Sequence, residues 1–425
     1  MKEKIVMAYS GGLDTSVAIK WLQDKYHAEV ITVIVDVGQG GDLEAVRKKA
    51  LTIGAVKSIL IDAKEEFVAK YILPAIKANA AYEDSYLLAT ALGRPLIAQL
   101  LVKVAAQENA TAVAHGCTGK GNDQVRFDVA VKVLNPKLKI IAPAREWDFT
   151  RPSAIEYARA NGIPLDGIIK TKIYSIDENL WGRSIECGVL EDAWLEPPED
   201  AFDMTSSPSA APDMPTYVTI DFEKGIPVGL DGQQTEPLAL INSLNIIAGA
   251  NSVGRMDHIE NRLVGIKSRE VYECPAGTVL HAAHQAMESM CLTRDMAHFK
   301  KLIEQKYSEL VYYGLWFSPL REALDAFVET TQQTVTGKVR MKLYKGTCTA
   351  VGRQSPFSLY NVKLATYEAG DTFNHKAAEG FIHLWGLDLQ TYGKVIRKAS
   401  QPAHEAAVAS EVICPAGALD TDYTG

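Results

Sequence analysis

The residues best suited to chemistry lie near the N-terminus, in the stretch KIVMAYSGGLDTS that covers residues 4–16. An apolar run there leads into two glycines, and hydroxyl side chains follow. Glycines let the backbone approach a phosphate, and the free N–H groups of the next helix's first turn point at it. Asp14 is unusual in a pure anion site, but a carboxylate is expected there if a divalent cation bridges it to the phosphates. The stretch therefore predicts a site for a phosphate chain with a divalent cation.

This stretch resembles the pyrophosphate-loop signature SGGxD[ST] of ATP pyrophosphatases. The alternative is an ordinary strand-to-helix turn whose hydroxyl groups cap the helix. A Walker loop would carry a lysine after its last glycine, to contact the β- and γ-phosphates. Because no lysine follows Gly12, we expect the loop to hold a leaving pyrophosphate rather than to transfer the γ-phosphoryl group.

Strand and helix patterns alternate through the first 160 residues. The expected strands cover 4–9, 29–36, 56–61, 110–114 and 138–141, and the expected helices follow residue 15 and cover 43–53, 67–78, 95–107, 122–133 and 152–160. We expect Asp42 to cap its helix and Pro74 to mark a kink or junction. The alternation predicts an α/β fold with a doubly wound parallel sheet. Ligands bind such sheets beyond the carboxyl ends of the strands, where the three glycine-bearing loops 10–12, 38–41 and 116–121 are expected.

A different pattern follows residue 162. We expect a linker over 161–175, a surface loop over 196–215, strands over 217–222 and 335–344, and helices over 277–290 and 294–311. This mixture predicts an α+β domain with antiparallel strands. An amphipathic helical stretch over 373–398 follows, with an apolar face made of Phe381, Leu384, Trp385, Leu389 and Tyr392. The expected domains are therefore 1–165 for nucleotide binding, 173–365 as an α+β domain, 373–398 as a C-terminal helix and 399–425 as a tail.

A second group of chemically useful residues lies in HGCTGKGNDQVR, residues 115–126. One loop combines flexible backbone, the Asn122 amide, the Thr118 hydroxyl and the cations Lys120 and Arg126. This set suits a zwitterionic or carboxylate ligand beside a nucleotide, since each charge-assisted hydrogen bond to a carboxylate contributes roughly 1.5–3 kcal/mol. His115 is open to two interpretations, a packed structural histidine or a catalytic one.

Composition restricts the broader possibilities. The 44 lysines and arginines against 52 aspartates and glutamates give a net charge of −8, which argues against non-specific nucleic-acid binding. The six cysteines are scattered without a CxxC pair, so neither a disulfide framework nor a structural zinc site is expected. The first strand follows the N-terminus at once, and we identify no apolar run near the roughly 20 residues that span a bilayer. These features favour a cytoplasmic protein that does not bind membranes.

Five ordered motifs carry a closer resemblance: SGGLDTS at 10–16, YEDSYLL at 82–88, HGCTGKGNDQVRF at 115–127, DENL at 177–180 and ENRLVGIKSREVYE at 260–273. Together they resemble the argininosuccinate synthase family over nearly the whole chain. The resemblance implies a ligase of arginine biosynthesis that joins citrulline to aspartate with Mg²⁺-ATP through a citrullyl-adenylate, releasing AMP and pyrophosphate. It also implies a homotetramer in which the C-terminal helix serves oligomerisation.

The resemblance assigns site residues position by position. ATP is expected at Ala8, Tyr9, Ser10, Gly11, Gly12, Leu13, Asp14, Thr15, Ser16, Val35 and Gly116. Aspartate is expected at Thr118, Asn122 and Asp123. Citrulline is expected at Tyr86, Asn122, Arg126, Ser175, Ser184, Glu260 and Tyr272. We expect Asp14 and Asp123 to serve catalysis, Asp14 through Mg²⁺ and Asp123 by orienting or deprotonating the aspartate amine.

Each assignment has a purely structural alternative. Tyr86 and Tyr272 are also typical core aromatics, Ser175 and Ser184 typical turn residues, and Glu260 a typical surface charge. The chain also departs from the family pattern, with Ala91 at a position that usually carries serine and Cys117 where alanine is common. The roughly 30 residues after Lys398 have no counterpart in that pattern.

Other functions remain open from sequence. A tRNA-modifying ligase would need an RNA-binding module, and an amidotransferase-type synthetase would need an ammonia source. A non-catalytic ATP-binding regulator would not need the 116–126 and 260–272 groups of residues.

Overall fold

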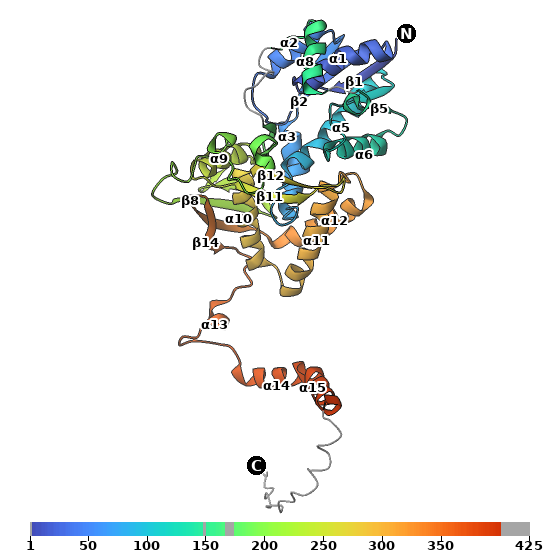
Figure 1. Cartoon of the computed structure of the whole chain (residues 1–425). Helices are drawn as coiled ribbons and strands as arrows, with labels where there is room; N and C mark the ends of the chain where they lie inside the picture. Colours follow the sequence, from blue (N-terminus) through green and yellow to red (C-terminus); the bar gives the residue numbers. More distant parts are fainter. Residues whose placement is uncertain (1, 148–149, 166–173, 401–425) are drawn as a thin grey trace, which may run out of the picture. The chain divides into compact units, whose positions relative to one another are not determined.

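The computed structural model describes residues 2–147, 150–165 and 174–400, which form two compact units divided after residue 359 (Figure 1). The first unit contains a parallel five-stranded sheet with strand order β3-β2-β1-β4-β5. Its strands are β1 (Lys4–Ala8), β2 (Glu29–Asp36), β3 (Lys57–Asp62), β4 (Ala112–Ala114) and β5 (Lys139–Ile141). The order runs outward in both directions from β1, so the prediction of a doubly wound sheet is confirmed.

Helices cover both faces of this sheet (Figure 1). One face carries α1 (Leu13–Tyr26), α2 (Leu43–Ile53) and α8 (Arg151–Ala160), and the other carries α5 (Ala89–Glu108) and α6 (Asp123–Leu134). The short helix α7 (Pro143–Glu146) follows β5.

Strand β1 is buried on both sides because successive side chains of a strand point to opposite faces. Ile5 and Met7 pack with residues of α1, whereas Val6 packs in the cluster that contains α5. All three are fully buried, as the apolar run predicted. The strand therefore fixes where the glycine loop leaves the sheet.

The expected helix 67–78 is instead three pieces: α3 (Lys64–Phe67), the π-helical turn η1 (Val68–Ile72) and α4 (Leu73–Lys77). Pro74 lies in the first turn of α4, where its missing N–H removes no hydrogen bond within that helix. The junction predicted at Pro74 is confirmed, because the π-helical turn η1 ends where α4, which contains Pro74, begins.

Helix α5 begins at Ala89, six residues before the expected start at 95, and Pro95 lies inside it. The Tyr86 hydroxyl accepts hydrogen bonds from the N–H groups of Thr90 at 2.9 Å and Ala91 at 3.4 Å, and so satisfies amides that open the helix. At 20 residues α5 is also long and apolar enough to cross a membrane, so the expectation that no run approaches this length was wrong. Most of it is buried in the first unit, as expected of a core helix.

Two antiparallel sheets and long helices make up the rest of the first unit, as predicted. One sheet has the order β11-β12-β7-β6, from β6 (Ser175–Asn179), β7 (Gly182–Glu186), β11 (Arg255–Asn261) and β12 (Lys267–Glu273). The other has the order β10-β9-β8-β13-β14, from β8 (Thr216–Glu223), β9 (Ile226–Leu230), β10 (Gln233–Gln234), β13 (Gly337–Tyr344) and β14 (Thr347–Gln354). The helices are α9 (Pro237–Ala250), α10 (Pro275–Cys291), α11 (Arg294–Tyr312) and α12 (Pro319–Thr331), with 3-10 turns η2 (Gly188–Glu191), η3 (Glu199–Ala201) and η4 (Gln332–Thr334). In β13 the buried residues Val339, Met341 and Leu343 alternate with more exposed ones, as the sequence pattern predicted.

The proline-rich segment 196–215 is tied to the sheet by one buried carboxylate. Glu273 accepts hydrogen bonds from the backbone N–H groups of Asp203, Met204 and Thr205 at 2.9–3.0 Å. It also accepts one from Arg183 Nη1 at 3.1 Å. The segment is therefore anchored at its centre rather than a simple surface loop.

We expect Glu273→Gln to destabilise the protein by about 3–5 kcal/mol, because it leaves buried donors and the Arg183 charge without their carboxylate. The free energy of unfolding, obtained by denaturant titration of the variant and the wild type, measures the loss of stability. Glu223→Gln, at the exposed end of β8, is the matched control and should change stability by no more than about 0.5 kcal/mol. Equal stability of the two variants would contradict this role of Glu273.

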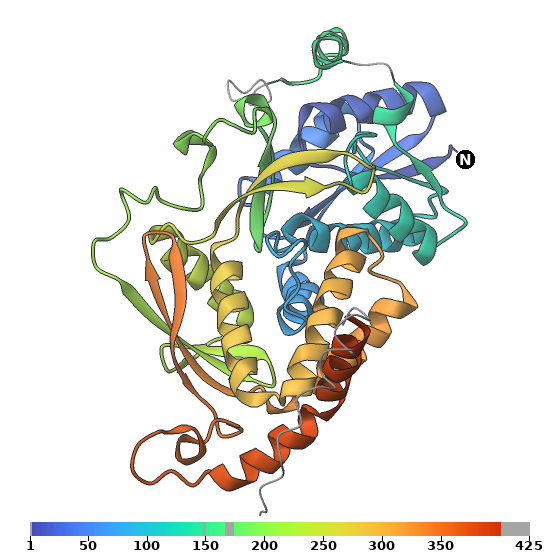
Figure 2. The ribbon, with the colours of Figure 1, turned by 60° about the horizontal axis from the view of Figure 1, so that its bottom comes forward.

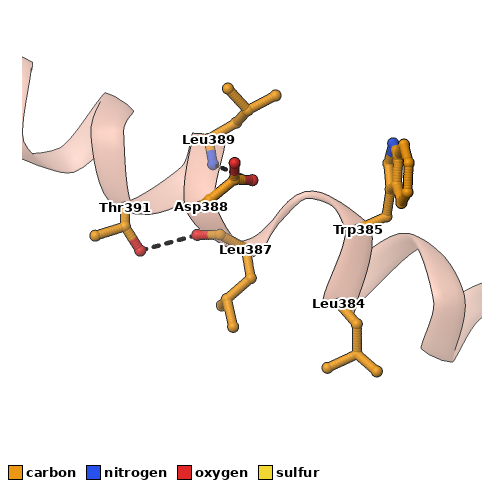
Figure 3. Close-up of a pocket in the computed structure, with 6 residues that line it drawn as sticks. All are labelled: Leu384, Trp385, Leu387, Asp388, Leu389 and Thr391. Atoms are coloured by element: carbon orange, nitrogen blue, oxygen red, sulfur yellow. Dashed lines mark hydrogen bonds between the residues drawn. The ribbon is translucent and has the colours of Figure 1, made fainter.

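The second unit contains α13 (Val362–Ala365), α14 (His375–Trp385) and α15 (Leu387–Ser400). The single helix expected over 373–398 is thus two helices that break at Gly386, whose N–H donates to the Ile382 carbonyl at 3.0 Å. Figure 3 shows this break, beyond which Thr391 Oγ1 donates to the Leu387 carbonyl at 2.8 Å. The predicted apolar side chains are all exposed, with Trp385 at 69% and Leu389 at 69%. Most of the predicted linker 161–175 and nearly all of the tail 399–425 lie outside the described residues.

Candidate active site

A cleft of about 740 Å³ lies in the first unit, beyond the carboxyl ends of β1, β2 and β4 and against the sheet that contains β12. Figure 2 shows the β11–β12 hairpin, in yellow, reaching towards the loop between β4 and α6. There the Leu263 N–H donates to Asn122 Oδ1 at 2.9 Å. The predicted site residues that line the cleft are Ala8, Tyr9, Ser10, Asp14, Thr15, Val35, Tyr86, Gly116, Thr118, Asn122, Asp123, Arg126, Ser175, Ser184, Glu260 and Tyr272. Residues far apart in the chain thus converge on one cavity.

Four predicted residues do not line it: Gly11, Gly12, Leu13 and Ser16. Leu13 packs into a small core with Val17. The Ser16 hydroxyl is hydrogen-bonded to the Tyr9 hydroxyl at 3.0 Å, and its N–H donates to the Gly12 carbonyl at 3.0 Å. The Ser16 hydroxyl and N–H therefore both bond within the loop and the start of α1 rather than at the cavity.

The glycine loop leaves the start of α1 open to an anion. Gly12 precedes the helix without any side-chain cap, so the first N–H groups of α1 remain available. Beside them, Ser10 Oγ and Thr15 Oγ1 lie 3.1 Å apart. Gly11 has φ of 78°, and a Cβ there would lie 2.8 Å from Val46 Cγ1. Both the left-handed backbone and the contact with α2 require glycine at this position.

We therefore expect Gly11→Ala to raise the KM for ATP by about 5- to 30-fold, which corresponds to roughly 1–2 kcal/mol of left-handed strain. Steady-state kinetics with ATP varied provide the measurement. Gly119→Ala is the control, because a Cβ at Gly119 would meet nothing within 4 Å. A normal ATP KM in Gly11→Ala would show that the loop tolerates the strain.

Two further contacts shape the nucleotide side of the cleft. A Cβ at Gly116 would lie 2.8 Å from Thr15 Cγ2, so the second glycine loop packs directly on the first. The Val35 carbonyl accepts a hydrogen bond from Gln39 Nε2 at 2.8 Å, and Gln39 Oε1 accepts one from the Val37 N–H at 2.8 Å. Gln39 thus folds the 38–41 loop back onto the end of β2.

Asp14 projects from the first turn of α1 at the edge of the cleft. Desolvation raises the pKa of Asp14, and the positive charge of Arg151 partly offsets this rise. No group of three or more His, Cys, Asp or Glu residues able to hold a metal occurs in the described ranges. A cation here would fit only as a partner of one carboxylate and of phosphate oxygens, the arrangement that Mg²⁺ prefers with nucleotides.

Asp123 is held between two arginines. Its carboxylate accepts from Arg94 Nε at 2.9 Å and from Arg126 Nη1 at 2.8 Å. Burial acts to raise the pKa of Asp123, but the charges of Arg94 and Arg126 outweigh it, and the pKa lies below its usual range. The group therefore stays ionised, which suits an orienting role better than that of a general base.

Two of the three guanidinium nitrogens of Arg126 form hydrogen bonds within the described part of the protein. Nη1 is bound to Asp123 and Nε donates to the Tyr312 carbonyl at 3.0 Å, whereas the buried Nη2 has no hydrogen-bond partner in the part of the chain that the structure describes. A buried cationic donor is costly to leave unpaired. The residue lines the cleft, so a ligand carboxylate is the natural partner for Nη2.

Glu260 and Tyr272 meet across the β11–β12 hairpin. The Tyr272 hydroxyl donates to Glu260 Oε2 at 2.6 Å. Tyr86 stacks on Tyr272 with ring centroids 4.1 Å apart. Glu260 is buried rather than a solvated surface charge, and the two tyrosines are packed together at the wall of the cleft.

The remaining predicted residues sit at its rim. Ser175 begins β6 and is exposed, Thr118 is exposed in the 116–121 loop, and Ser184 Oγ is 3.5 Å from Thr90 Oγ1. His115 is buried, stacks on Phe127 and is bonded to Asp128 Oδ1 at 2.8 Å. Its contacts support the structural interpretation.

Several cleft residues were not identified from the sequence: Arg94, Asp177, Glu186, Arg262 and Glu270. Arg94 bonds Asp177 as well as Asp123 and so links α5, α6 and β6. Burial and the charge of Glu186 raise the pKa of Glu270 to about 8. Asp177 lies in the motif DENL, and Arg262 and Glu270 lie in the motif ENRLVGIKSREVYE. Arg94 and Glu186 lie in none of the five motifs that the sequence singled out.

Comparison with known proteins agrees with this geometry. The family model described as "Arginosuccinate synthase N-terminal HUP domain" matches residues 4–164, and the "Arginosuccinate synthase C-terminal domain" model matches residues 174–392. The chain is 59% identical to the argininosuccinate synthase of Oceanobacillus iheyensis over 93% of this chain and 94% of that protein. It is 59% identical to that of a Synechococcus strain over 93% and 98%, and 56% identical to that of Halalkalibacterium halodurans over 96% and 100%. The chain belongs to the argininosuccinate synthase family.

Proposed function

We propose that this protein joins citrulline to aspartate at the expense of ATP, releasing argininosuccinate, AMP and pyrophosphate, and so serves arginine biosynthesis. The observation that carries the proposal concerns Arg126, which lines the same cavity as Ser10, Asp14 and Thr15 of the glycine loop. Its buried Nη2 has no hydrogen-bond partner among the described residues. One cavity thus offers a phosphate site and a carboxylate site. An adenylating ligase for amino acids needs both.

The site supports the expected substrate positions. ATP would lie on the loop from Ala8 to Ser16, with Val35 and Gly116 beside the nucleotide. Aspartate would contact Thr118, Asn122 and Asp123. Citrulline would bind through the residues Tyr86, Asn122, Arg126, Ser175, Ser184, Glu260 and Tyr272.

The proposed reaction consists of two successive nucleophilic substitutions, the first at phosphorus and the second at carbon. The ureido oxygen of citrulline attacks the α-phosphorus of ATP, the bond to the bridging oxygen breaks, and pyrophosphate leaves into the glycine loop. The aspartate amine then attacks the adenylated carbon, loses a proton, and AMP leaves with the former ureido oxygen. Neither step needs a side-chain nucleophile, and alignment of the reactants can supply roughly 7–11 kcal/mol of the barrier.

The protein's own groups hold and orient the reactants. The N–H groups opening α1 and the Ser10 and Thr15 hydroxyls would stabilise charge on the departing pyrophosphate. Asp14 would hold Mg²⁺, which supplies charge neutralisation on the phosphates when bound. Ionised Asp123 would orient the aspartate amine.

We further propose the division into a nucleotide domain (1–165), a synthetase domain (173–365), a C-terminal oligomerisation element (373–398) and a tail (399–425). The exposed apolar face of α14 and α15 supports a role of that element in a homotetramer. The acidic net charge supports a cytoplasmic protein with small-molecule substrates and without nucleic-acid or membrane partners.

The test is AMP release from ATP, with citrulline and aspartate added separately and then together. We expect AMP, pyrophosphate and argininosuccinate in equal amounts, and only when both citrulline and aspartate are present. Cleavage of ATP to ADP and orthophosphate would contradict the proposal. AMP formation that depends on ammonia or tRNA would favour another pyrophosphate-loop ligase, and ATP binding without turnover would favour a regulator.

A further inference from the structure

Tyr312 is the last residue of α11 and is fully buried, and it is not among the residues that line the cleft. It nevertheless touches three of the predicted substrate-binding residues. These residues come from two different elements, α6 and β11, and Tyr312 comes from a third.

The Tyr312 hydroxyl forms a directional chain between two of them. Asn122 Nδ2 donates to it at 2.8 Å, and the hydroxyl in turn donates to Glu260 Oε1. Burial and the nearby Glu260 charge both raise the pKa of Tyr312, so the hydroxyl keeps the proton that this chain requires. The other oxygen of Glu260 is held by Tyr272, so two tyrosines fix the carboxylate from opposite sides.

The remainder of the residue supports Arg126 and the hairpin. Its carbonyl accepts from Arg126 Nε, and the guanidinium carbon lies 4.9 Å from the ring centroid. The ring stacks on Tyr82 at 3.6 Å with an interplanar angle of 6°. The Tyr82 hydroxyl in turn donates to the Asn261 carbonyl at 2.8 Å, next to Glu260 in β11.

We propose that Tyr312 is a positioning residue for the citrulline site, which orients Glu260 and Asn122 through its hydroxyl without touching the substrate. This inference rests on the proposed function. Loss of the hydroxyl frees one Glu260 oxygen and leaves the Asn122 donor unsatisfied, so both groups turn away from the orientation that the substrate needs. The phosphate loop shares no contact with Tyr312 among the described residues, so ATP binding should not respond.

The experiment compares Tyr312→Phe with Tyr307→Phe, a buried tyrosine about one and a half turns earlier in the same helix. The Tyr307 ring lies edge-on to Trp316 at 6.5 Å, and its hydroxyl has no hydrogen-bond partner among the described residues. We expect Tyr312→Phe to raise the citrulline KM by about 10- to 150-fold, the range for losing one hydrogen bond to a charged group. The KM for ATP should stay within about twofold, since the effect is transmitted only through Glu260 and Asn122. Tyr307→Phe should leave both KM values unchanged, whatever it costs in thermal stability.

A double variant tests the route through Glu260. If Tyr312 acts in part by orienting that carboxylate, Tyr312→Phe should raise the citrulline KM by a smaller factor in Glu260→Gln than in wild type, and the remainder is the effect through Asn122. Independent, additive effects would overturn the proposal, as would a citrulline KM in Tyr312→Phe that matches wild type or rises together with the ATP KM. Failure of the wild-type protein to form AMP with citrulline and aspartate would instead contradict the proposed function, so the two failures are distinguishable.

Discussion

Replacement of Asp14 by asparagine is expected to lower the rate of AMP formation by about 10²–10³-fold, or roughly 2.7–4 kcal/mol in the barrier. Asparagine keeps the size of the side chain but removes the charge that would hold Mg²⁺ against the phosphates. Asp14 is exposed in the first turn of α1, so the fold should be retained. Initial rates at saturating ATP, citrulline and aspartate, together with a thermal melt, provide the measurement.

The matched control is Asp24→Asn, an exposed aspartate in the same helix. It pairs with Lys20 at 3.2 Å and accepts a hydrogen bond from the Tyr157 hydroxyl at 3.2 Å. This variant should turn over like wild type. Titration with Mg²⁺ adds a second readout, because Asp14→Asn should need more of the cation to reach half of its own maximal rate. Wild-type rates and an unchanged Mg²⁺ requirement in Asp14→Asn would remove the residue from the metal site.

Replacement of Arg126 by alanine is expected to raise the citrulline KM by about 10- to 150-fold, from the loss of roughly 1.5–3 kcal/mol for a charged hydrogen bond. In the proposed site Nη2 is the group that would bind the substrate carboxylate, since it has no hydrogen-bond partner among the described residues. The other nitrogens hold the Asp123 carboxylate and the Tyr312 carbonyl. Arg126→Lys should recover little of the loss, because an ammonium group cannot make these three contacts at once. Kinetics with citrulline varied at saturating ATP and aspartate measure the effect.

Lys132→Ala serves as the control on the same helix, since that exposed lysine donates only to the Leu138 carbonyl at 3.2 Å among the contacts described. Its citrulline KM should equal that of wild type. An unchanged citrulline KM in Arg126→Ala would place the substrate carboxylate elsewhere in the cleft.

Local patterns predicted the elements of the parallel sheet well. Strand β2 and helix α2 have the predicted bounds, and Asp42 caps α2 by accepting from the Ala45 N–H at 2.9 Å. These features depend on neighbours in the chain, namely an apolar run, a capping side chain and glycine turns. The start of α5 was missed because its first N–H groups are satisfied by the Tyr86 hydroxyl, a cap from outside the helix that helix-start signals do not include.

Residue types and short spacings predicted the chemical groups of the site, namely the glycine loop with Asp14 and the cationic loop ending at Arg126. The alternation of strand and helix patterns predicted the doubly wound sheet. Such features depend on close neighbours in the chain, so they can be read from the sequence. Which groups keep free hydrogen-bonding capacity is visible only in the folded chain. Packing pairs the Ser16 hydroxyl with that of Tyr9 and leaves Arg126 Nη2 without a hydrogen-bond partner among the described residues. It also brings Tyr312 onto Glu260 and Asn122 from 52 and 190 residues away. The physical reason is that hydrogen-bond saturation depends on which surfaces pack together, and no local pattern encodes contacts between side chains so distant in sequence.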